Sequence, residues 1–321
     1  MNITKSKKNY FEVERAGINT TFQDNGRENL NHIGIPVSGA MDKRNYILAN
    51  ALLNKNLNDP VIEFAYQGPL LKYKGEKIYI VITGDIKFQI VRDDGYKIIG
   101  QPYQVYCIEN NYKIDLQSTN KSVYGYISIS ENFILKKFWG SFSVNTKAKI
   151  GSNNGEKITN KQKIIIEHKN RNITETSLKY TNSKIEYIRA IKSTNFDFFS
   201  DKSKKTFFHK EFKVTKLSDR MGMRLEGQVL KNIVDSNIKS EGLVKGVIQV
   251  PSDGNPIIML SDHGTIGGYP KIANVISADF DKLVQMIPGS IIKFKEVNLD
   301  EAEKLFQFYN LETNNLINQI R

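Results

Sequence analysis

Cysteine is almost absent from this sequence of 321 residues, and its scarcity excludes several classes of protein. The single cysteine, Cys107, cannot form a disulfide within the chain, so the cross-links of small secreted domains are ruled out. Cys107 lies in the apolar stretch 105–108, where we expect a core position rather than a nucleophile. A chain without internal disulfides fits a reducing compartment, and we expect a cytoplasmic location.

Long apolar runs and metal-binding patterns are missing as well. The longest apolar run, around residues 78–83, is far shorter than the roughly 20 residues that a membrane-spanning helix needs. The N-terminal residues carry basic side chains with no apolar run behind them, which is not the pattern of a secretory signal. The four histidines are isolated, so we expect no metal site. The sequence contains neither a GxxxxGK[ST] phosphate-binding loop nor a GxSxG nucleophile elbow.

Positive charge, in contrast, is abundant, with 46 Lys and Arg against 34 Asp and Glu. An excess of this size can attract nucleic acid. The densest clusters, Lys5–Lys8 and Lys202–Lys210, are short and have few aromatic or arginine neighbours. We therefore expect solvated, lysine-rich loops and no nucleic-acid or membrane partner, while the charge remains compatible with an acidic protein partner.

Short β-branched and aromatic runs recur between turn residues, which predicts a mainly-β protein of the sandwich or barrel type with a few helices. The predicted strands are 10–14, 70–73, 77–82, 87–91, 105–108, 123–129, 163–167, 185–191, 212–214, 247–250, 257–260, 274–276 and 291–297. Helices are predicted from an N-cap at Asp42 to about residue 53, over 279–286, and from Asn298, with Glu301 completing a capping box, to about residue 309. The polar region 147–184 is the best candidate for a domain junction or an exposed excursion.

The segment 240–271 concentrates more chemically useful residues than any other. Its two apolar runs predict a pair of strands joined by a turn. The second run is followed by an acid, a histidine, a hydroxyl, glycines, a tyrosine and a lysine, namely Asp262, His263, Gly264, Thr265, Gly267, Gly268, Tyr269 and Lys271. This composition indicates either a site or an ordinary exit from a hairpin, and His263 by itself is more often a surface histidine.

Two other clusters allow a functional and a structural interpretation. In the block 20–42, Asp24 and Arg27 either clamp a polar ligand or form a local ion pair, and Asp42 caps a helix whose N-terminus also suits an anion or a carbonyl oxygen. In the block 217–227, Arg220 either binds a carboxylate in fork geometry or joins a structural network, as Arg220 with Glu226 or as Asp219 with Arg224.

These blocks together resemble the biotin-dependent carboxyltransferase-like family. That family includes the C subunit of 5-oxoprolinase, the second subunit of allophanate hydrolase, the carboxyltransferase domain of urea carboxylase and an antagonist of a sporulation histidine-kinase inhibitor. The resemblance runs from residue 17 to about residue 297. The blocks that carry it are TTFQDNGR (20–27), GIPVSGAMD (34–42), LAN (48–50), IEFAYQGP (62–69), SDRMGMRLEG (218–227), SEGLVKGVIQVPSDGNPI (240–257) and GGYPKIANVISAD (267–279).

The resemblance implies two cyclophilin-like β-barrel domains, which we place at 1–184 and 185–321. It also implies a component of an ATP-dependent 5-oxoprolinase that opens 5-oxo-L-proline to L-glutamate together with subunits A and B. ATP is then used by the complex, and this chain alone binds no cofactor. The alternatives are a carboxyltransferase component of a urea or allophanate pathway, the one case in which biotin is implied, and a non-catalytic regulator that antagonises a histidine-kinase inhibitor. The Met-Lys-Met motif of a biotin carrier is absent.

The same resemblance implies the residues of the site. Arg220 or Lys271 is expected to polarise a carbonyl, and Asp262 to manage protons. The expected substrate-binding residues are Asp24, Arg27, Asp42, Gln249, Gly267, Gly268 and Tyr269. The chain departs from the family pattern at Gly264, where glutamine is usual, and at Asn29, where glycine is usual; the first change removes a side-chain amide from the expected cleft.

Overall fold

The computed structural model describes residues 9–169, 171, 173–180 and 186–320. The chain divides into two compact units, each assembled from separate segments of the sequence. Unit 1 consists of residues 1–26, 43–180 and 315–321, and unit 2 of residues 27–42 and 181–314. The predicted boundary between residues 184 and 185 lies outside the described residues.

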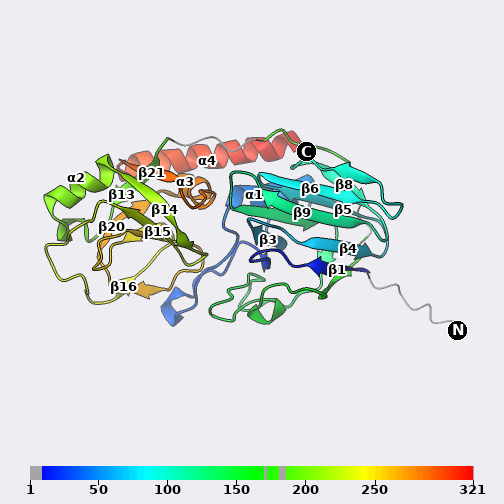
Figure 1. Cartoon of the computed structure of the whole chain (residues 1–321), viewed down its shortest axis with the longest axis horizontal. Coiled ribbons are helices and arrows are strands. Elements are labelled where there is room, and N and C mark those ends of the chain that lie inside the picture. The colour runs from blue at the N-terminus through cyan, green and yellow to red at the C-terminus, as the bar shows by residue number, and fades with distance from the viewer. Residues whose placement is uncertain (1–8, 170, 172, 181–185, 321) are drawn as a thin grey trace. The chain divides into compact units, whose positions relative to one another are not determined.

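The strands of unit 1 form two sheets, in blue to green in Figure 1. The seven-stranded sheet has the order β11-β12-β1-β4-β9-β6-β7, with β1 Asn9–Arg15, β4 Leu70–Lys74, β6 Ile86–Val91, β7 Lys97–Ile99, β9 Lys113–Thr119, β11 Asn132–Phe133 and β12 Lys163–Glu167. The five-stranded sheet has the order β2-β3-β10-β5-β8, with β2 Thr21–Gln23, β3 Val61–Ala65, β5 Ile78–Thr83, β8 Val105–Ile108 and β10 Tyr124–Ile129.

Unit 1 contains two buried apolar clusters, a larger one between the strands and a smaller one around Leu48 and Leu52 of helix α1 (Lys43–Leu52). The larger cluster forms because apolar residues alternate along many of the strands and place every second side chain on the inner face. Phe11 and Val13 of β1 pack in the same buried cluster as Phe22 of β2 and Ile127 of β10, so both sheets contribute to it. Helix α1 packs on β5 and β10. The two sheets are thus held together by shared apolar burial.

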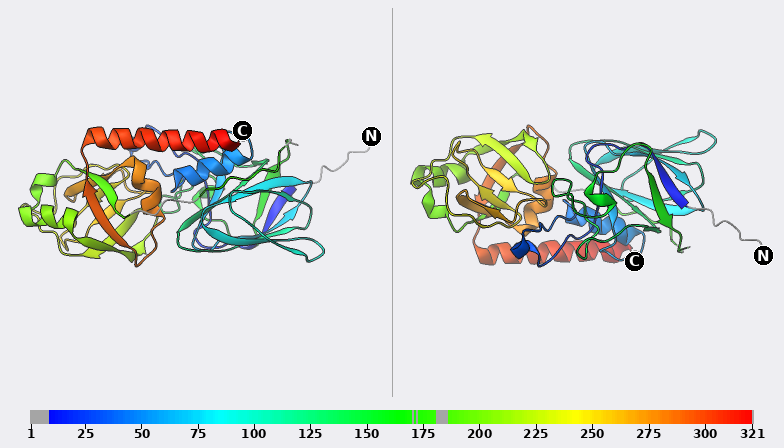
Figure 2. Two further views of the ribbon diagram at one scale, coloured as in Figure 1. Left: turned by 90° about the horizontal axis from the view of Figure 1, so that it is seen from above. Right: turned by 90° about the horizontal axis from the view of Figure 1, so that it is seen from below.

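Unit 2 contains a closed barrel with the strand order β13-β20-β17-β18-β15-β14-β21, in green to orange in Figures 1 and 2. The strands are β13 Ile188–Lys192, β14 Glu211–Ser218, β15 Gly222–Gly227, β17 Val247–Gln249, β18 Ile257–Met259, β20 Lys271–Val275 and β21 Ile291–Glu296. A separate pair, β16 (Glu241–Gly242) and β19 (Ile266–Gly267), lies outside the barrel order. The predicted hairpin of the segment 240–271 is confirmed, since Ile248 is paired with Ile258 in antiparallel register.

Three helices lie partly or wholly in unit 2: α2 Asp201–His209, α3 Ser277–Val284 and α4 Leu299–Ile320. Phe207 of α2 stacks on Phe294 of β21, with 4.4 Å between the ring centroids. The predicted capping box of α4 is confirmed: the Asn298 backbone N–H donates to Glu301 Oε2 at 3.0 Å, and the Glu301 N–H donates to Asn298 Oδ1 at 2.9 Å. Short 3-10 turns occur at Asn31–Ile33, Asn153–Gly155 and Phe196–Phe198.

The mainly-β class with a few helices is confirmed, and every predicted strand overlaps an observed one. Of the predicted strand 185–191, Ile185 lies outside the described residues. Eight of the described strands have no counterpart among the predicted ranges, namely β2, β3, β7, β9, β11, β15, β16 and β19. Of these, β9 has seven residues and β15 has six. Two predictions are wrong in detail: the cluster Lys202–Lys210 is mostly helix α2 rather than a loop, and α4 continues to Ile320 rather than ending near residue 309. The cluster Lys5–Lys8 lies outside the described residues. No helix in the described part of the chain has both the length and the apolarity needed to cross a membrane.

Candidate functional site

Unit 2 contains a pocket of about 530 Å³, here called the barrel pocket. It is formed where β14 turns into β15, along β17 and β18, and by the loop that follows β18. The lining residues are Lys216, Leu217, Ser218, Asp219, Met221, Gly222, Arg224, Gln249, Ile257, Met259, His263, Gly264 and Tyr269. Its volume lies within the range of small-molecule sites, and its wall combines apolar side chains with cationic, hydroxyl and amide groups.

Gln249 and Tyr269, two of the predicted substrate-binding residues, line the barrel pocket. Gln249 is buried, and its Nε2 donates to the Tyr269 carbonyl oxygen at 3.0 Å. Its Oε1 makes no hydrogen bond to any residue that the structure describes, which leaves an oriented acceptor at the pocket wall. Tyr269 is 38% exposed, so its ring is accessible to a ligand.

His263 is a functional candidate that was not among the site residues predicted from the sequence. It is only 2% exposed and lines the barrel pocket, so the expectation of a surface histidine is wrong. Its Nδ1 lies 2.6 Å from the Gly264 carbonyl oxygen, and because a carbonyl can only accept, Nδ1 carries the proton. Burial lowers the pKa of His263, which favours the neutral ring and leaves Nε2 as an acceptor.

Arg220 and Asp262 form a buried, bidentate ion pair beside the barrel pocket. Arg220 Nε donates to Asp262 Oδ2 at 2.8 Å and Nη2 donates to Oδ1 at 3.1 Å, while Nη2 also donates to the Gly39 carbonyl oxygen at 2.7 Å. The structural network expected from the sequence paired Arg220 with the wrong carboxylate, because Glu226 forms an ion pair with Lys213. The Asp219 carboxylate accepts from the backbone N–H groups of the turn that follows it.

Lys271 lies on β20 opposite Gln249 of β17, although it does not line the barrel pocket. Its ammonium forms an ion pair with Glu241 of β16, and its backbone N–H donates to Asn195 Oδ1 at 3.2 Å. The Lys271 ammonium lowers the pKa of Glu241. Glu241 and Asn195 were not predicted, because pairs that are 30 and 76 residues apart leave no local sequence signal.

The space available for a Cβ atom differs among the glycines of the loop after β18. A Cβ atom on Gly267 would lie 2.7 Å from Gln249 Nε2 and 2.8 Å from Leu243 Cδ1, so only glycine lets Gln249 keep its place. A Cβ on Gly268 would lie 3.1 Å from the Ile238 carbonyl oxygen, which is a tight contact. At Gly264 the nearest atom is the Ile266 carbonyl oxygen at 3.5 Å, so a side chain fits there and its absence leaves room at the pocket wall.

The other predicted residues lie elsewhere. Asp24 belongs to unit 1, where its carboxylate accepts from the Ser141 and Ser143 hydroxyls, both at 2.5 Å, and from the backbone N–H groups of Gly26 and Phe142. Arg27 and Asp42 belong to unit 2 but do not line the barrel pocket. Arg27 is buried, and its backbone N–H donates to the Val37 carbonyl oxygen at 2.8 Å; the Asp42 Oδ2 accepts from Gln285 Nε2 at 2.8 Å.

The predicted residues of unit 2 therefore form one local assembly and a set of supports. Gln249 and Tyr269 line the pocket, the Arg220–Asp262 and Lys271–Glu241 pairs lie in the adjoining turns and strands, and Gly267 makes room for Gln249.

Within the described ranges, no three His, Cys, Asp or Glu side chains are grouped so that they could hold a metal ion. Cys107 is half-buried, and burial raises the pKa of its thiol.

The fold and the pocket define the class of protein: a mainly-β chain with a closed barrel, whose pocket carries amide, imidazole and cationic groups. Residues 33–296 match the model of the carboxyltransferase domain, subdomain A and B, and the chain belongs to this family.

The relatives extend over almost the whole chain. It is 34% identical over 286 residues to a Haemophilus influenzae protein named as the C subunit of 5-oxoprolinase, covering 89% of this chain and 90% of that protein. An Escherichia coli protein of the same name is 29% identical over 300 residues, covering 92% of this chain and 94% of that protein. The K. lactis urea amidolyase shares the fold with a TM-score of 0.88 and 23% identity, over 98% of this chain and 20% of that much longer chain.

Proposed function

We propose that this chain is the C subunit of a cytoplasmic 5-oxoprolinase complex, a hydrolase that opens 5-oxo-L-proline to L-glutamate with the use of ATP. The observation that carries this proposal is the similarity, over nine-tenths of both chains, to the Haemophilus influenzae protein of that name. Subunits A and B are the proposed partners. ATP is used by the complex, and we assign no cofactor to this chain alone.

The chemistry of the barrel pocket supports a cyclic amide as the ligand. A lactam presents one N–H donor and one carbonyl acceptor on adjacent atoms, and 5-oxoproline adds a carboxylate. Gln249 Oε1 is an acceptor for the N–H, and Arg224 at the pocket wall is a fork-shaped partner for the carboxylate. The Nε2 of His263 is an acceptor for a proton from water, because the ring is neutral and its Nδ1 is committed to Gly264.

The buried Arg220–Asp262 pair and the half-exposed Lys271–Glu241 pair then act as positioning elements. Both oxygens of Asp262 already accept hydrogen bonds from Arg220, so we assign this pair to holding the loop after β18 and not to proton transfer or carbonyl polarisation. Lys271 is held by Glu241 next to the strand that carries Gln249, and we retain it as a residue needed for activity.

Reconstitution tests the proposal. The chain is co-purified with candidate subunits A and B, and glutamate formation is measured with 5-oxoproline and ATP. We expect turnover that depends on all three subunits and falls at least 10-fold in Gln249→Leu and in Lys271→Ala, since a lost polar contact in a closed site commonly costs that much or more. Gln117→Leu, at an exposed position of β9, is the matched control. An assembled complex without turnover, or full activity in both site variants, would refute the assignment.

A second candidate is a carboxyltransferase component that acts in a urea or allophanate pathway, favoured by the fold shared with the urea amidolyase. The ureido ring of biotin presents a carbonyl and two N–H groups, so it suits the same Gln249 acceptor. Biotin that has first been carboxylated on a ring nitrogen would supply an activated carboxyl group. To test this candidate, a biotin carboxylase and a biotin carrier replace subunits A and B in the assay, and urea and bicarbonate replace 5-oxoproline. ATP-dependent carboxylation of urea would support the candidate, and its absence would count against it.

A further inference from the structure

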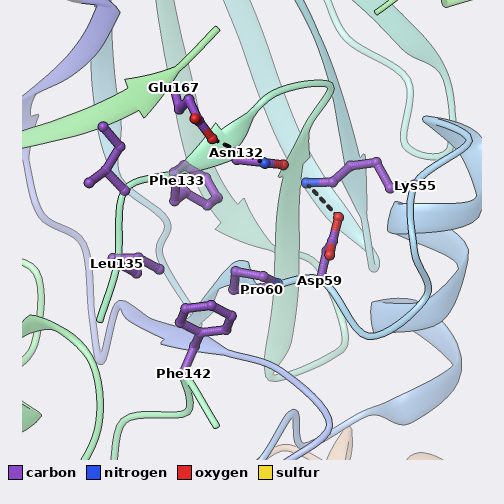
Figure 3. A pocket seen from close by; sticks show the side chains of 9 residues that line it. Lys55, Asp59, Pro60, Asn132, Phe133, Leu135, Phe142 and Glu167 are labelled. Atoms are coloured by element: carbon purple, nitrogen blue, oxygen red, sulfur yellow. Dashed lines mark hydrogen bonds and ion pairs between the residues drawn. The ribbon is translucent and has the colours of Figure 1, made fainter. Parts of the chain in front are cut away.

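Unit 1 contains a second pocket of about 360 Å³ that the proposed function does not use. It lies between the loop after α1, the strand β11 with the residues that follow it, and the end of β12 (Figure 3). The lining residues are Lys55, Asp59, Pro60, Asn132, Phe133, Ile134, Leu135, Phe142 and Glu167. We call it the Lys55 pocket.

Lys55 is an unusual lining residue because its side chain is only 1% exposed. Its ammonium donates to the Glu131 carbonyl oxygen at 3.0 Å and lies 3.7 Å from Asp59 Oδ2, which is an ion pair beyond hydrogen-bond length. An ammonium has three protons to donate, and a buried charge is costly unless its donors are satisfied. The described residues therefore supply Lys55 with fewer acceptors than it can use.

The loop that carries Lys55 and Asp59 is fixed in place. Asn50 Nδ2 donates to the Asp59 carbonyl oxygen at 2.8 Å and to the Leu57 carbonyl oxygen at 3.3 Å, while Asn50 Oδ1 accepts from the Ser128 hydroxyl at 2.7 Å. The fully buried Asn50 thus ties this loop to β10. The position of Lys55 is set before any ligand arrives.

The two sides of the Lys55 pocket differ in polarity. Figure 3 shows Lys55, Asp59, Asn132 and Glu167 around one part of it, and Phe133, Leu135, Pro60 and Phe142 around the other. Such an arrangement suits a small molecule with a polar head and an apolar body.

The charges on the polar side narrow the class of ligand. Among the lining residues the one cation is Lys55 and the carboxylates are Asp59 and Glu167. Two more cations lie close by: Arg171 donates to Asn132 Oδ1 at 3.3 Å, and Lys169 lies 3.0 Å from Glu167. A simple anion would be attracted by the Lys55 ammonium but repelled by both carboxylates, and a simple cation would be repelled by Lys55. A zwitterion places its carboxylate at Lys55 and its ammonium at Asp59 or Glu167, so each charge finds an opposite one.

We propose that the Lys55 pocket is a binding site for a free α-amino acid with an apolar side chain. The carboxylate accepts from Lys55 Nζ, the ammonium donates to the Asp59 or Glu167 carboxylate, and the side chain packs on Phe133, Leu135 and Phe142. Burial lowers the pKa of Lys55 to about 8, so the ammonium is still the main form near neutral pH and a bound carboxylate stabilises it further. The site lies in unit 1, and its test does not depend on the barrel pocket of unit 2.

Calorimetric titration of the intact chain tests this proposal. The probes are L-leucine and L-methionine at up to about 10 mM, a concentration that saturates a millimolar site. The matched probes are glycine, which lacks the side chain, 4-methylpentanoate, which lacks the ammonium, and 3-methylbutylamine, which lacks the carboxylate. We expect at least one of the two amino acids to bind at least 10-fold more tightly than all three matched probes. No binding of either amino acid, or equal binding of 4-methylpentanoate, would overturn the proposal.

Two variants locate the site. Lys55→Met keeps the length of the side chain and removes the ammonium, and Phe142→Ala shortens the apolar wall; we expect each to weaken binding at least 10-fold. Lys113→Met, at a half-exposed lysine of unit 1 that pairs with Glu14 outside the pocket, is the control and should bind normally. Circular dichroism checks folding, and if Lys55→Met does not fold, Phe142→Ala decides alone. Unchanged binding in the folded variants would place the amino acid elsewhere and overturn the proposal.

Discussion

Replacing Arg220 by methionine removes the guanidinium that holds both oxygens of the Asp262 carboxylate. The two side chains are 9% and 4% exposed, so water can replace the lost hydrogen bonds only in part. Breaking a buried ion pair from one side costs about 3–5 kcal/mol, because the remaining charge is left without compensation. A protein with about 5–15 kcal/mol of total stability would lose a large part of it. We therefore expect Arg220→Met and Asp262→Leu each to lower the free energy of unfolding by about 3–5 kcal/mol.

The double variant Arg220→Met/Asp262→Leu distinguishes the loss of the ion pair from the cost of leaving one buried charge unpaired. It leaves no uncompensated charge, so we expect it to be more stable than either single variant. Urea unfolding followed by far-ultraviolet circular dichroism measures all three, and the fluorescence of Trp139, the one tryptophan in the sequence, reports on unit 1 as an internal control. Single variants that lose less than about 1 kcal/mol, the usual value of an exposed pair, or a double variant that loses the sum of both, would refute the reasoning.

Three further predictions concern the loop after β18 and its supports. Gly267→Ala places a Cβ 2.7 Å from Gln249 Nε2, so we expect at least a 10-fold loss of turnover in the reconstituted complex; wild-type activity would contradict this. Gly264→Ala meets only a backbone oxygen of the same loop, at 3.5 Å, and should change the unfolding free energy in urea by less than about 1 kcal/mol. Lys271 lowers the pKa of Glu241 in the folded protein below the value of 4.5 for an unperturbed carboxyl group. The pair therefore stabilises the fold at pH values above 4.5, and this stabilisation is lost as the pH falls through the lowered pKa of the folded protein. The stability difference between wild type and Lys271→Met should therefore shrink in urea titrations at progressively lower pH, and a constant difference would count against the pair.

Local patterns predicted most of the secondary structure. The capping box at Asn298 and the hairpin of the segment 240–271 are encoded within a few residues, and both are present. The strand β3 was not predicted, because all five of its residues are buried and the run includes Glu63, so it shows no alternation. Helix α2 was not predicted, because its nine residues include three lysines and its composition is that of a solvated loop. Its packing depends on the stacking of Phe207 on Phe294, a contact that is not visible in the local sequence.

The site was predicted only in outline. Gln249 and Tyr269 line the barrel pocket, and their role in binding stays a prediction, whereas His263 was expected at the surface and is buried at this pocket. The Asp24 carboxylate accepts hydrogen bonds from two serine hydroxyls and two backbone N–H groups, so the structure shows it fixing a loop, and its binding of a substrate stays a prediction. A carboxylate in a motif looks the same in the sequence whether it binds a substrate or fixes a loop.

By itself the sequence determined the mainly-β class, the strands and caps that depend on neighbouring residues, and the family, because these are written in short-range pattern and in ordered motifs. Only the tertiary structure decided which charges pair. Arg220 meets Asp262 across 42 residues and Lys271 meets Glu241 across 30, and these partners are selected by the closure of the barrel and the loops around it. The same is true of Lys55, whose side chain is buried because the loop after α1 brings it to the Glu131 carbonyl oxygen, directly before β11. Burial and pairing set the chemistry of a charged group, and both arise from residues that are distant in the chain.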